Sequence, residues 1–234
     1  MATYAGAVAG TYQQFCAVAA ALDAVGDRWT LLVVRELLAG PRRYGELVQG
    51  LPGVATNLLA DRLRRLEAAG LVAQDPGPDG RARVYRLTDR GAELDAVVAA
   101  LARFGIALLP DDAAGLAFRA DWLAIAVRLL LRPGALDADL VVRFDVVGPD
   151  GPQVLQLRLG PEGAAADPDG TADVALAGDP AALVAALRDP ARAQLLAEEG
   201  RLTVTGSAAD RARLASAFGA RSSHVLSADV VHLQ

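Results

Sequence analysis

A strongly patterned helix in the first half of the chain is the feature that most limits the fold. Leu59, Leu63 and Leu66 recur at the spacing that places side chains on one helix face, so this face is expected to be buried. We expect Thr56 to cap the helix at its start and Gly70 to end it. The opposite face is polar and basic, so the helix should lie at a surface with one side in a core.

Two short strand patterns follow this helix directly. They cover Leu71–Gln74 and Arg83–Leu87, and the intervening run rich in proline and glycine is typical of a turn. Before the patterned helix, apolar spacing predicts three helices, at Phe15–Val25, Trp29–Leu38 and Tyr44–Gln49.

A further helix is expected after the hairpin, with Thr88 as its cap and an apolar stripe that extends to Leu108. Helices, a β-hairpin and a trailing helix in this order predict a winged helix-turn-helix domain over residues 1–110.

Arginine and short polar groups gather on the exposed side of the patterned helix and around the hairpin. Such groups can read base edges in the major groove, and arginines at a hairpin tip can reach phosphate or the minor groove. The candidate DNA-binding residues are Arg42, Arg43, Thr56, Asn57, Ala60, Asp61, Arg64, Arg65, Arg81 and Arg83. The alternative is a solvated arginine face on a small helical domain.

Charge is unevenly divided along the 234 residues, whose net charge is −5. Residues 1–110 carry 12 arginines and 11 acidic residues, whereas residues 111–234 carry 11 arginines and 17 acidic residues. An acidic protein can still bind nucleic acid if its arginines share one face. The division suggests two units with different partners, with ordinary drift in surface charge as the alternative.

Four ordered elements of the first half resemble HxlR-type regulators, which are relatives of the MarR regulators. Cys16 and the run Leu22–Leu32 resemble the start of these proteins, and Arg42–Leu47 resembles their short arginine-containing element. Leu58–Val72 is similar to their recognition helix and first wing strand, and Arg83–Gly91 to their second wing strand. The resemblance covers about residues 12–108.

This resemblance implies a homodimer that binds a pseudo-palindromic DNA operator through two winged helices. In the family, the first and last helices make much of the dimer contact. The residues of the last helix that would fill this role are Leu94, Val98, Leu101, Phe104 and Leu108. Packing within the protomer is the alternative for this stripe.

Two positions depart from the family pattern. Ala17 replaces the proline that usually follows the cysteine, and Asp27–Arg28 stands where Gly-Lys is common. Some family members sense oxidants through the cysteine, which requires a stabilised thiolate. Cys16 has no adjacent cation in the sequence, so we expect a small buried apolar residue rather than a redox sensor.

The second half predicts a different kind of unit. Residues 111–136 are expected to form a linker and an apolar connecting helix at Leu116–Leu131. Residues 137–234 then show the order strand, strand, strand, strand, helix, helix, strand, helix, with Asp179 and Ser207 as helix caps. The expected strands cover Leu140–Val147, Val154–Leu159, Ala164–Ala166, Thr171–Ala177 and Leu202–Thr205.

This order resembles the sterol carrier protein domain. Three stretches carry the likeness, Ala172–Pro180, Glu199–Gly206 and Leu214–Phe218, and it covers about residues 137–219. It implies an α/β sandwich with a mainly antiparallel sheet, so that the whole chain belongs to the α+β class.

Such domains enclose an apolar cavity, and a small hydrophobic guest would enter it by desolvation. The candidate ligand-binding residues are Trp122, Arg128, Phe144, Val146, Leu157 and Phe218. For each apolar member, plain core packing is the alternative, and Arg128 could instead be an ordinary surface residue.

No catalytic constellation, cofactor motif or metal-ligand pattern is expected. The single cysteine excludes an intramolecular disulfide, and His224 and His232 lie in a tail without metal-ligand spacing. No signal peptide or membrane-spanning run is expected, so the sequence favours a cytoplasmic protein. Because no catalytic constellation is expected, the protein is not expected to be an enzyme.

Three functional hypotheses remain from the sequence. The favoured one is a dimeric transcriptional regulator, expected to be a repressor, that binds an operator and senses a small hydrophobic effector through residues 137–234. The second is the same DNA-binding dimer with a C-terminal domain that serves only structure or partner contact. The third is a lipid carrier that has lost DNA binding.

Overall fold

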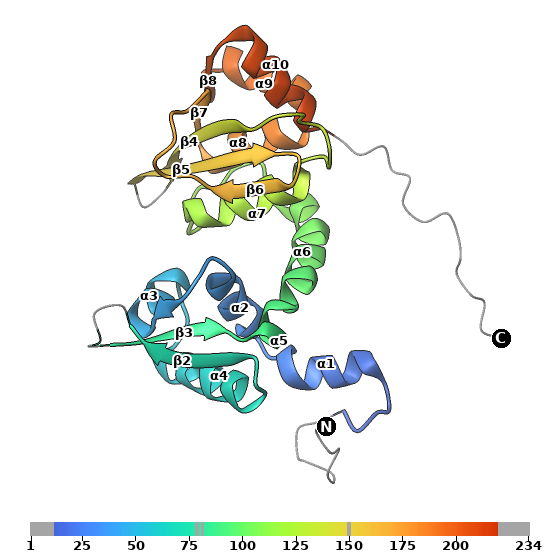
Figure 1. Ribbon diagram of the computed structural model, residues 1–234, viewed down its shortest axis with the longest axis vertical. Coiled ribbons are helices and arrows are strands. Elements are labelled where there is room, and N and C mark those ends of the chain that lie inside the picture. The colour runs from blue at the N-terminus through green and yellow to red at the C-terminus, as the bar shows by residue number, and fades with distance from the viewer. Residues whose placement is uncertain (1–11, 78–79, 81, 149–150, 220–234) are drawn as a thin grey trace, which may run out of the picture. The chain divides into compact units, whose positions relative to one another are not determined.

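The computed structural model describes residues 12–77, 80, 82–148 and 151–219 (Figure 1). Its contacts divide the chain into two compact units, residues 1–101 and 102–234, and each unit is described by itself. The boundary lies within a helix, earlier than the expected domain end at residue 110. The tail that contains His224 and His232 lies outside the described residues, as does Arg81.

Unit 1 consists of short helices around a small sheet. Its elements are α1 (Ala17–Val25), α2 (Thr30–Leu38), β1 (Arg42–Arg43), α3 (Tyr44–Gly50), α4 (Thr56–Ala68), β2 (Val72–Pro76), β3 (Arg83–Leu87) and α5 (Asp89–Ala92), followed by α6 (Leu94–Gly105), which continues into unit 2. The strand order is β1-β3-β2, and both pairings are antiparallel. Helices and hairpin follow one another as the winged helix-turn-helix prediction requires.

The buried leucines of α4 build the centre of unit 1. Leu59, Leu63 and Leu66 are at most 1% exposed and belong to one cluster with residues of α2, α3 and the strands. The prediction of this buried stripe is confirmed. Because one face of α4 is fixed in the core, its opposite face is held toward solvent in a fixed orientation.

Two local predictions in unit 1 are wrong. Thr56 is the first residue of α4 rather than its cap, because Ala55 occupies the N-cap position and makes no side-chain bond there. The expected single final helix is divided into α5 and α6, although Thr88 does cap α5 by accepting the Gly91 N–H at 3.0 Å. Packing of α5 against Leu71, which the sequence pattern does not record, accompanies this division.

Unit 2 combines one five-stranded sheet with helices. After the end of α6 and a 3₁₀ turn, its elements are α7 (Ala120–Leu130), β4 (Leu140–Gly148), β5 (Gly151–Gly160), β6 (Gly163–Ala166), β7 (Val174–Gly178), α8 (Pro180–Arg188), α9 (Pro190–Glu198), β8 (Leu202–Gly206) and α10 (Ala208–Ala217). This order agrees with the prediction from sequence. The caps are also confirmed, since Asp179 accepts the Ala182 N–H and Ser207 accepts the Asp210 N–H.

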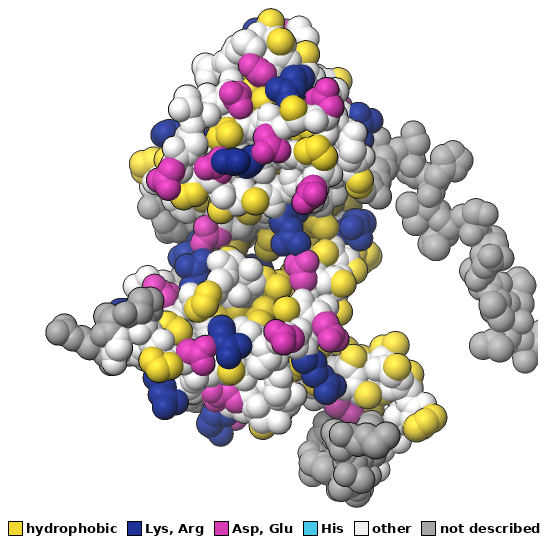
Figure 2. All heavy atoms as spheres, viewed as in Figure 1, with side chains coloured by type: hydrophobic (Ala, Val, Ile, Leu, Met, Phe, Trp, Pro, Cys, Tyr) yellow, Lys and Arg dark blue, Asp and Glu magenta, His cyan; other side chains and the backbone are white. Residues whose placement is uncertain are grey.

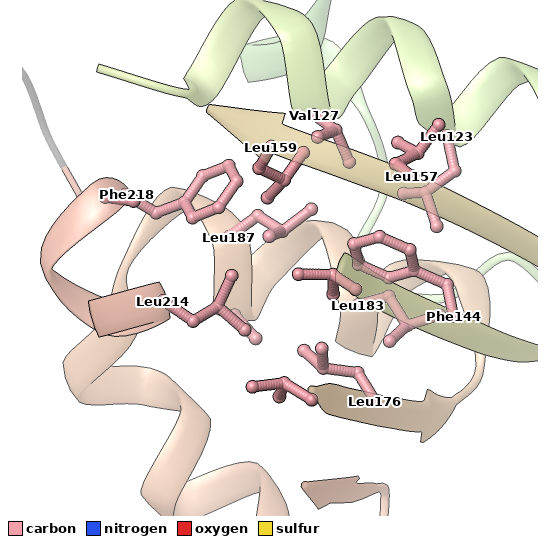
Figure 3. Packing of buried hydrophobic residues seen from close by; sticks show 14 of the residues in the cluster. Leu123, Val127, Phe144, Leu157, Leu159, Leu176, Leu183, Leu187, Leu214 and Phe218 are labelled. Atoms are coloured by element: carbon pink, nitrogen blue, oxygen red, sulfur yellow. The ribbon is translucent and has the colours of Figure 1, made fainter. Parts of the chain in front are cut away.

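The sheet of unit 2 has the order β6-β5-β4-β7-β8. All pairings are antiparallel except that of β4 with β7, so the sheet is mainly antiparallel. Alternate residues of β4 are buried, and α7, α8 and α10 pack against the sheet. The buried side chains of these elements form one hydrophobic cluster (Figure 3).

The connecting helix α7 begins four residues later than expected. Gln153 of β5 causes this difference, because its side chain accepts the Ala120 N–H at 2.8 Å and donates to the Phe118 carbonyl at 3.1 Å. The chain before α7 is therefore held by a contact with a distant strand. None of the helices in the described ranges is long and apolar enough to cross a membrane.

Candidate nucleic-acid interface

Helix α4 presents a polar face opposite its buried leucines. Thr56 and Asn57 are exposed in its first turn, and the side chains of Arg64 and Arg65 are 72% and 65% exposed. Ala60 and Asp61 are half-buried between these two groups. Helical periodicity therefore placed four of the six α4 candidates on an exposed surface and two at its half-buried middle, although Asn57 turns its amide oxygen toward the Leu58 N–H.

Asp61 is the centre of an ion-pair network on this face. Its Oδ1 accepts from Arg64 at 3.2 Å, and its Oδ2 accepts from Arg65 and from Arg62, each at 2.9 Å. Asp27, in the turn before α2, contacts Arg62 at 3.1 Å and Arg65 at 3.4 Å. The arginines of α4 are therefore held by two carboxylates rather than extended freely into solvent.

Arg62 is the member of this network that sequence reasoning missed. Its side chain is only 12% exposed, and its Nε donates to the Arg28 carbonyl at 3.3 Å. It fastens α4 to the turn before α2. The signal was Asp27–Arg28, which departs from the family pattern and supplies both a carboxylate and a carbonyl to Arg62.

The start of α3 lies beside the start of α4. The Tyr44 hydroxyl donates to the Thr56 carbonyl at 2.7 Å, and the Arg43 N–H donates to Glu46 at 2.6 Å. Arg42 and Arg43 form β1, which pairs with Tyr85 and Val84 of β3. This short strand was not expected from the sequence, and it attaches both arginines to the wing.

An open hollow of about 600 Å³ lies between the start of α3 and the wing. Its lining includes Arg43, Tyr44, Glu46, Arg83 and Tyr85. Burial, with smaller contributions from Glu67 and Tyr44, raises the pKa of the Tyr85 phenol. The hollow thus offers a phenol and arginine side chains side by side.

The wing is the β2–β3 hairpin. Arg83 is exposed and its Nη1 lies 3.5 Å from the Gln74 side chain, whereas Arg86 pairs with Asp75 on the neighbouring strand. Figure 2 shows acidic and basic side chains interspersed on the visible face of unit 1, without one continuous basic field. The arginines on α4 and at the wing are therefore discrete contact points.

Comparison with known families agrees with this geometry. A family profile described as HxlR-like helix-turn-helix matches residues 24–112. A helix-turn-helix transcriptional regulator of Synechocystis is 41% identical over 91 residues, which are 38% of this chain and 67% of that protein. YvaP of Bacillus subtilis, also named as such a regulator, is 34% identical over 36% of this chain and 79% of its own length.

The chain belongs to the HxlR-like helix-turn-helix family. A regulator of Mycobacterium tuberculosis is 42% identical over 94 residues, and the chain spans 59% of its length. These relatives are named as transcriptional regulators and not as enzymes, in agreement with the expectation from sequence. The family match ends at residue 112 and leaves the sterol-carrier likeness of unit 2 a prediction.

The apolar stripe that runs along α6 and the 3₁₀ turn Ile106–Leu108 of this HxlR-like protein packs in the core in its first half and is exposed in its second half. Val98 is only 9% exposed, and Leu94 packs against the same core, so both stabilise their own protomer. Leu101, Phe104 and Leu108 are 50%, 72% and 70% exposed. The dimer contact of this stripe stays a prediction, and of its five residues the last three are exposed.

Cys16 is exposed, so the expectation that it is buried is wrong. It occupies the N-cap position of α1, where the backbone N–H groups of Ala19 and then Val18 lower the pKa of its thiol. A cation is not needed for this effect, because the first N–H groups of a helix have no partner within the helix.

The apolar candidates for a ligand wall in unit 2 lie in its core. Phe144, Val146, Leu157 and Phe218 are at most 4% exposed and belong to one packed cluster, in which the labelled side chains converge (Figure 3). Trp122 is half-buried and meets Phe118 edge to face, with ring centroids 6.4 Å apart. Arg128 is exposed on α7. Within the described residues, no group of His, Cys, Asp and Glu side chains is arranged to bind a metal.

Proposed function

We propose that the chain is a DNA-binding transcriptional regulator that acts in the cytoplasm on a double-stranded operator. The observation that carries this proposal is the face of α4 opposite the buried leucines, where Arg64 and Arg65 are exposed beside an arginine-bearing wing. Membership of the HxlR-like family supports it, since the relatives are named as transcriptional regulators.

In this proposal, α4 enters the major groove with Thr56, Asn57, Arg64 and Arg65 toward base edges. Arg83, together with Arg81, contacts phosphate or the minor groove from the wing. Arg42 and Arg43 lie on β1, next to the wing strand, and serve as further phosphate contacts.

The regulator is proposed to act as a homodimer on a pseudo-palindromic operator. Large apolar side chains are exposed on two of its helices. They are Val18 and Leu22 on α1, with Phe15 just before it, and Val97, Leu101 and Phe104 on α6. Exposed apolar surface of this kind marks interaction sites, and a second copy would cover it.

The test measures binding of an operator selected from random duplexes and of a random-sequence duplex. Arg64→Ala is expected to weaken operator binding about 10- to 100-fold, the loss of roughly 1–3 kcal/mol of base contact. Arg83→Ala is expected to weaken both duplexes similarly and to lower the salt slope by about 1. Arg143→Ala, in unit 2, is the matched control. Wild-type affinity in both unit 1 variants would remove the assignment.

We further propose that unit 2 is a sterol-carrier-like domain that binds a small hydrophobic effector and controls a repressor. The five-stranded, mainly antiparallel sheet with one apolar face under helices supports this reading. An effector would act only if it binds the DNA-competent and DNA-incompetent states unequally.

Native mass spectrometry of the purified protein, followed by extraction of any co-purified small molecule, tests this second proposal. A dimer with a defined apolar adduct supports it. An empty dimer whose operator affinity does not change across a panel of hydrophobic compounds favours the alternative, a C-terminal domain for structure or partner contact. A protein without DNA binding but with a lipid adduct favours a lipid carrier.

A further inference from the structure

Two carboxylates contact the arginines on the face of α4 that should approach DNA. Asp61 contacts Arg64 and Arg65, the two most exposed arginines of the helix, and Asp27 contacts Arg65 from the turn before α2. A negative charge at this place repels phosphate, so its presence on the DNA-facing side needs an explanation.

The need of the half-buried Arg62 for hydrogen-bond acceptors explains only part of this ion-pair network. Arg62 is 12% exposed and needs acceptors, which Asp61, Asp27 and the Arg28 carbonyl supply. Arg64 and Arg65 are mostly exposed and need no such compensation, and exposed ion pairs add little to stability. The main effect of their pairing with Asp61 is therefore on how many free N–H groups the helix offers to an approaching phosphate.

We propose that Asp61, assisted by Asp27, is a specificity-determining residue that withholds Arg64 and Arg65 from phosphates of random sequence. This inference rests on the proposed DNA-binding function. A phosphate must displace the Asp61 carboxylate from the same N–H groups before it gains either arginine. An operator can compensate, because guanine O6 and N7 accept from the arginines while a cytosine N4 amino group donates to the released carboxylate.

This arrangement makes a prediction about salt. Each arginine that neutralises a phosphate contributes about 0.9 to the slope of log affinity against log salt. Arginines that remain paired with Asp61 release fewer counterions, so the wild-type slope on random DNA should be small. Removal of the Asp61 charge should free Arg64 for phosphate and leave Arg65 with only the more distant Asp27, at 3.4 Å.

The test is binding of a random-sequence duplex and of the selected operator by Asp61→Asn at several salt concentrations. We expect about 10-fold tighter binding of the random duplex, a slope larger by about 1–2, and a lower ratio of operator to random affinity. Asp145→Asn is the matched control, because it removes the same charge from an exposed pair in unit 2, where Asp145 lies 2.8 Å from Arg143.

Equal changes in affinity and slope for Asp61→Asn and Asp145→Asn would overturn the inference, since net charge alone would then explain both. Asp27→Asn is the second variant and removes only the more distant carboxylate of Arg65, which Asp61 still contacts at 2.9 Å, so its slope should rise by less than that of Asp61→Asn. Thermal unfolding reports whether Asp61→Asn folds. If it does not fold, the slope measured for Asp27→Asn tests the inference, and a slope equal to that of the wild type would overturn it. A wild-type protein that binds neither duplex would remove the proposed function itself, and this inference with it.

Discussion

At the scale of single residues, Cys16 shows how backbone geometry changes side-chain chemistry. The sequence offers no cation near it, yet the structure places it at the N-cap position of α1, where the backbone N–H groups of Ala19 and Val18 lower the pKa of its thiol. Sequence reasoning failed here because it judged the setting from the adjacent side chains, whereas the helix boundary decides it.

The lowered pKa predicts faster alkylation of native Cys16 than of the unfolded chain. Below the ordinary thiol pKa of about 8.5, the folded protein has the larger thiolate fraction, and this advantage disappears as pH rises above that value. The measurement is the rate of reaction with iodoacetamide against pH, with and without urea, and Cys16→Ser as the blank. Equal midpoints in both states would contradict the prediction.

At the scale of elements, three of the four predicted caps were read correctly, Thr56 was not a cap, and distant contacts were missed. Asp179, Ser207 and Thr88 cap helices as expected, because each bonds an N–H only a few residues away. The start of α7 depends on Gln153, 33 residues after Ala120 in sequence, and no local pattern shows that contact. In the candidate site, periodicity placed the exposed face of α4 but could not show how Asp61 and Arg62 join it to the turn before α2.

Gly91 in α5 lies at another contact between residues distant in sequence, and this contact predicts the effect of a substitution. A Cβ added there would lie 1.9 Å from the Leu71 carbonyl oxygen, which is fixed by the Thr88 N–H at 3.0 Å. Gly91→Ala should therefore lower the free energy of unfolding by about 1–3 kcal/mol through overpacking. Gly105→Ala is the control, since nothing lies near its added Cβ and helix propensity favours alanine by about 1 kcal/mol. Urea unfolding measures both, and equal stability of the two variants would refute the packing argument.

At the scale of the whole molecule, one chain contains unit 1, which the family match covers, and unit 2, for which a ligand is proposed. The order of elements in unit 2, and that of unit 1 apart from β1 and the division of the last helix, followed from periodicity and capping, whereas the α+β class was implied by the sterol-carrier resemblance. The oligomeric state did not, because exposed Leu101 and Phe104 report an available surface and not what covers it.

The most direct test of the central claim is hydroxyl-radical footprinting of the selected operator by the wild-type protein. A dimer with one α4 in each of two major grooves should protect two segments related by two-fold symmetry, about 10 base pairs apart from centre to centre. Arg64→Ala should lose this pattern at concentrations that saturate the wild type. A diffuse or absent footprint, or one that Arg64→Ala leaves unchanged, would contradict the assignment of α4 as the DNA-reading element.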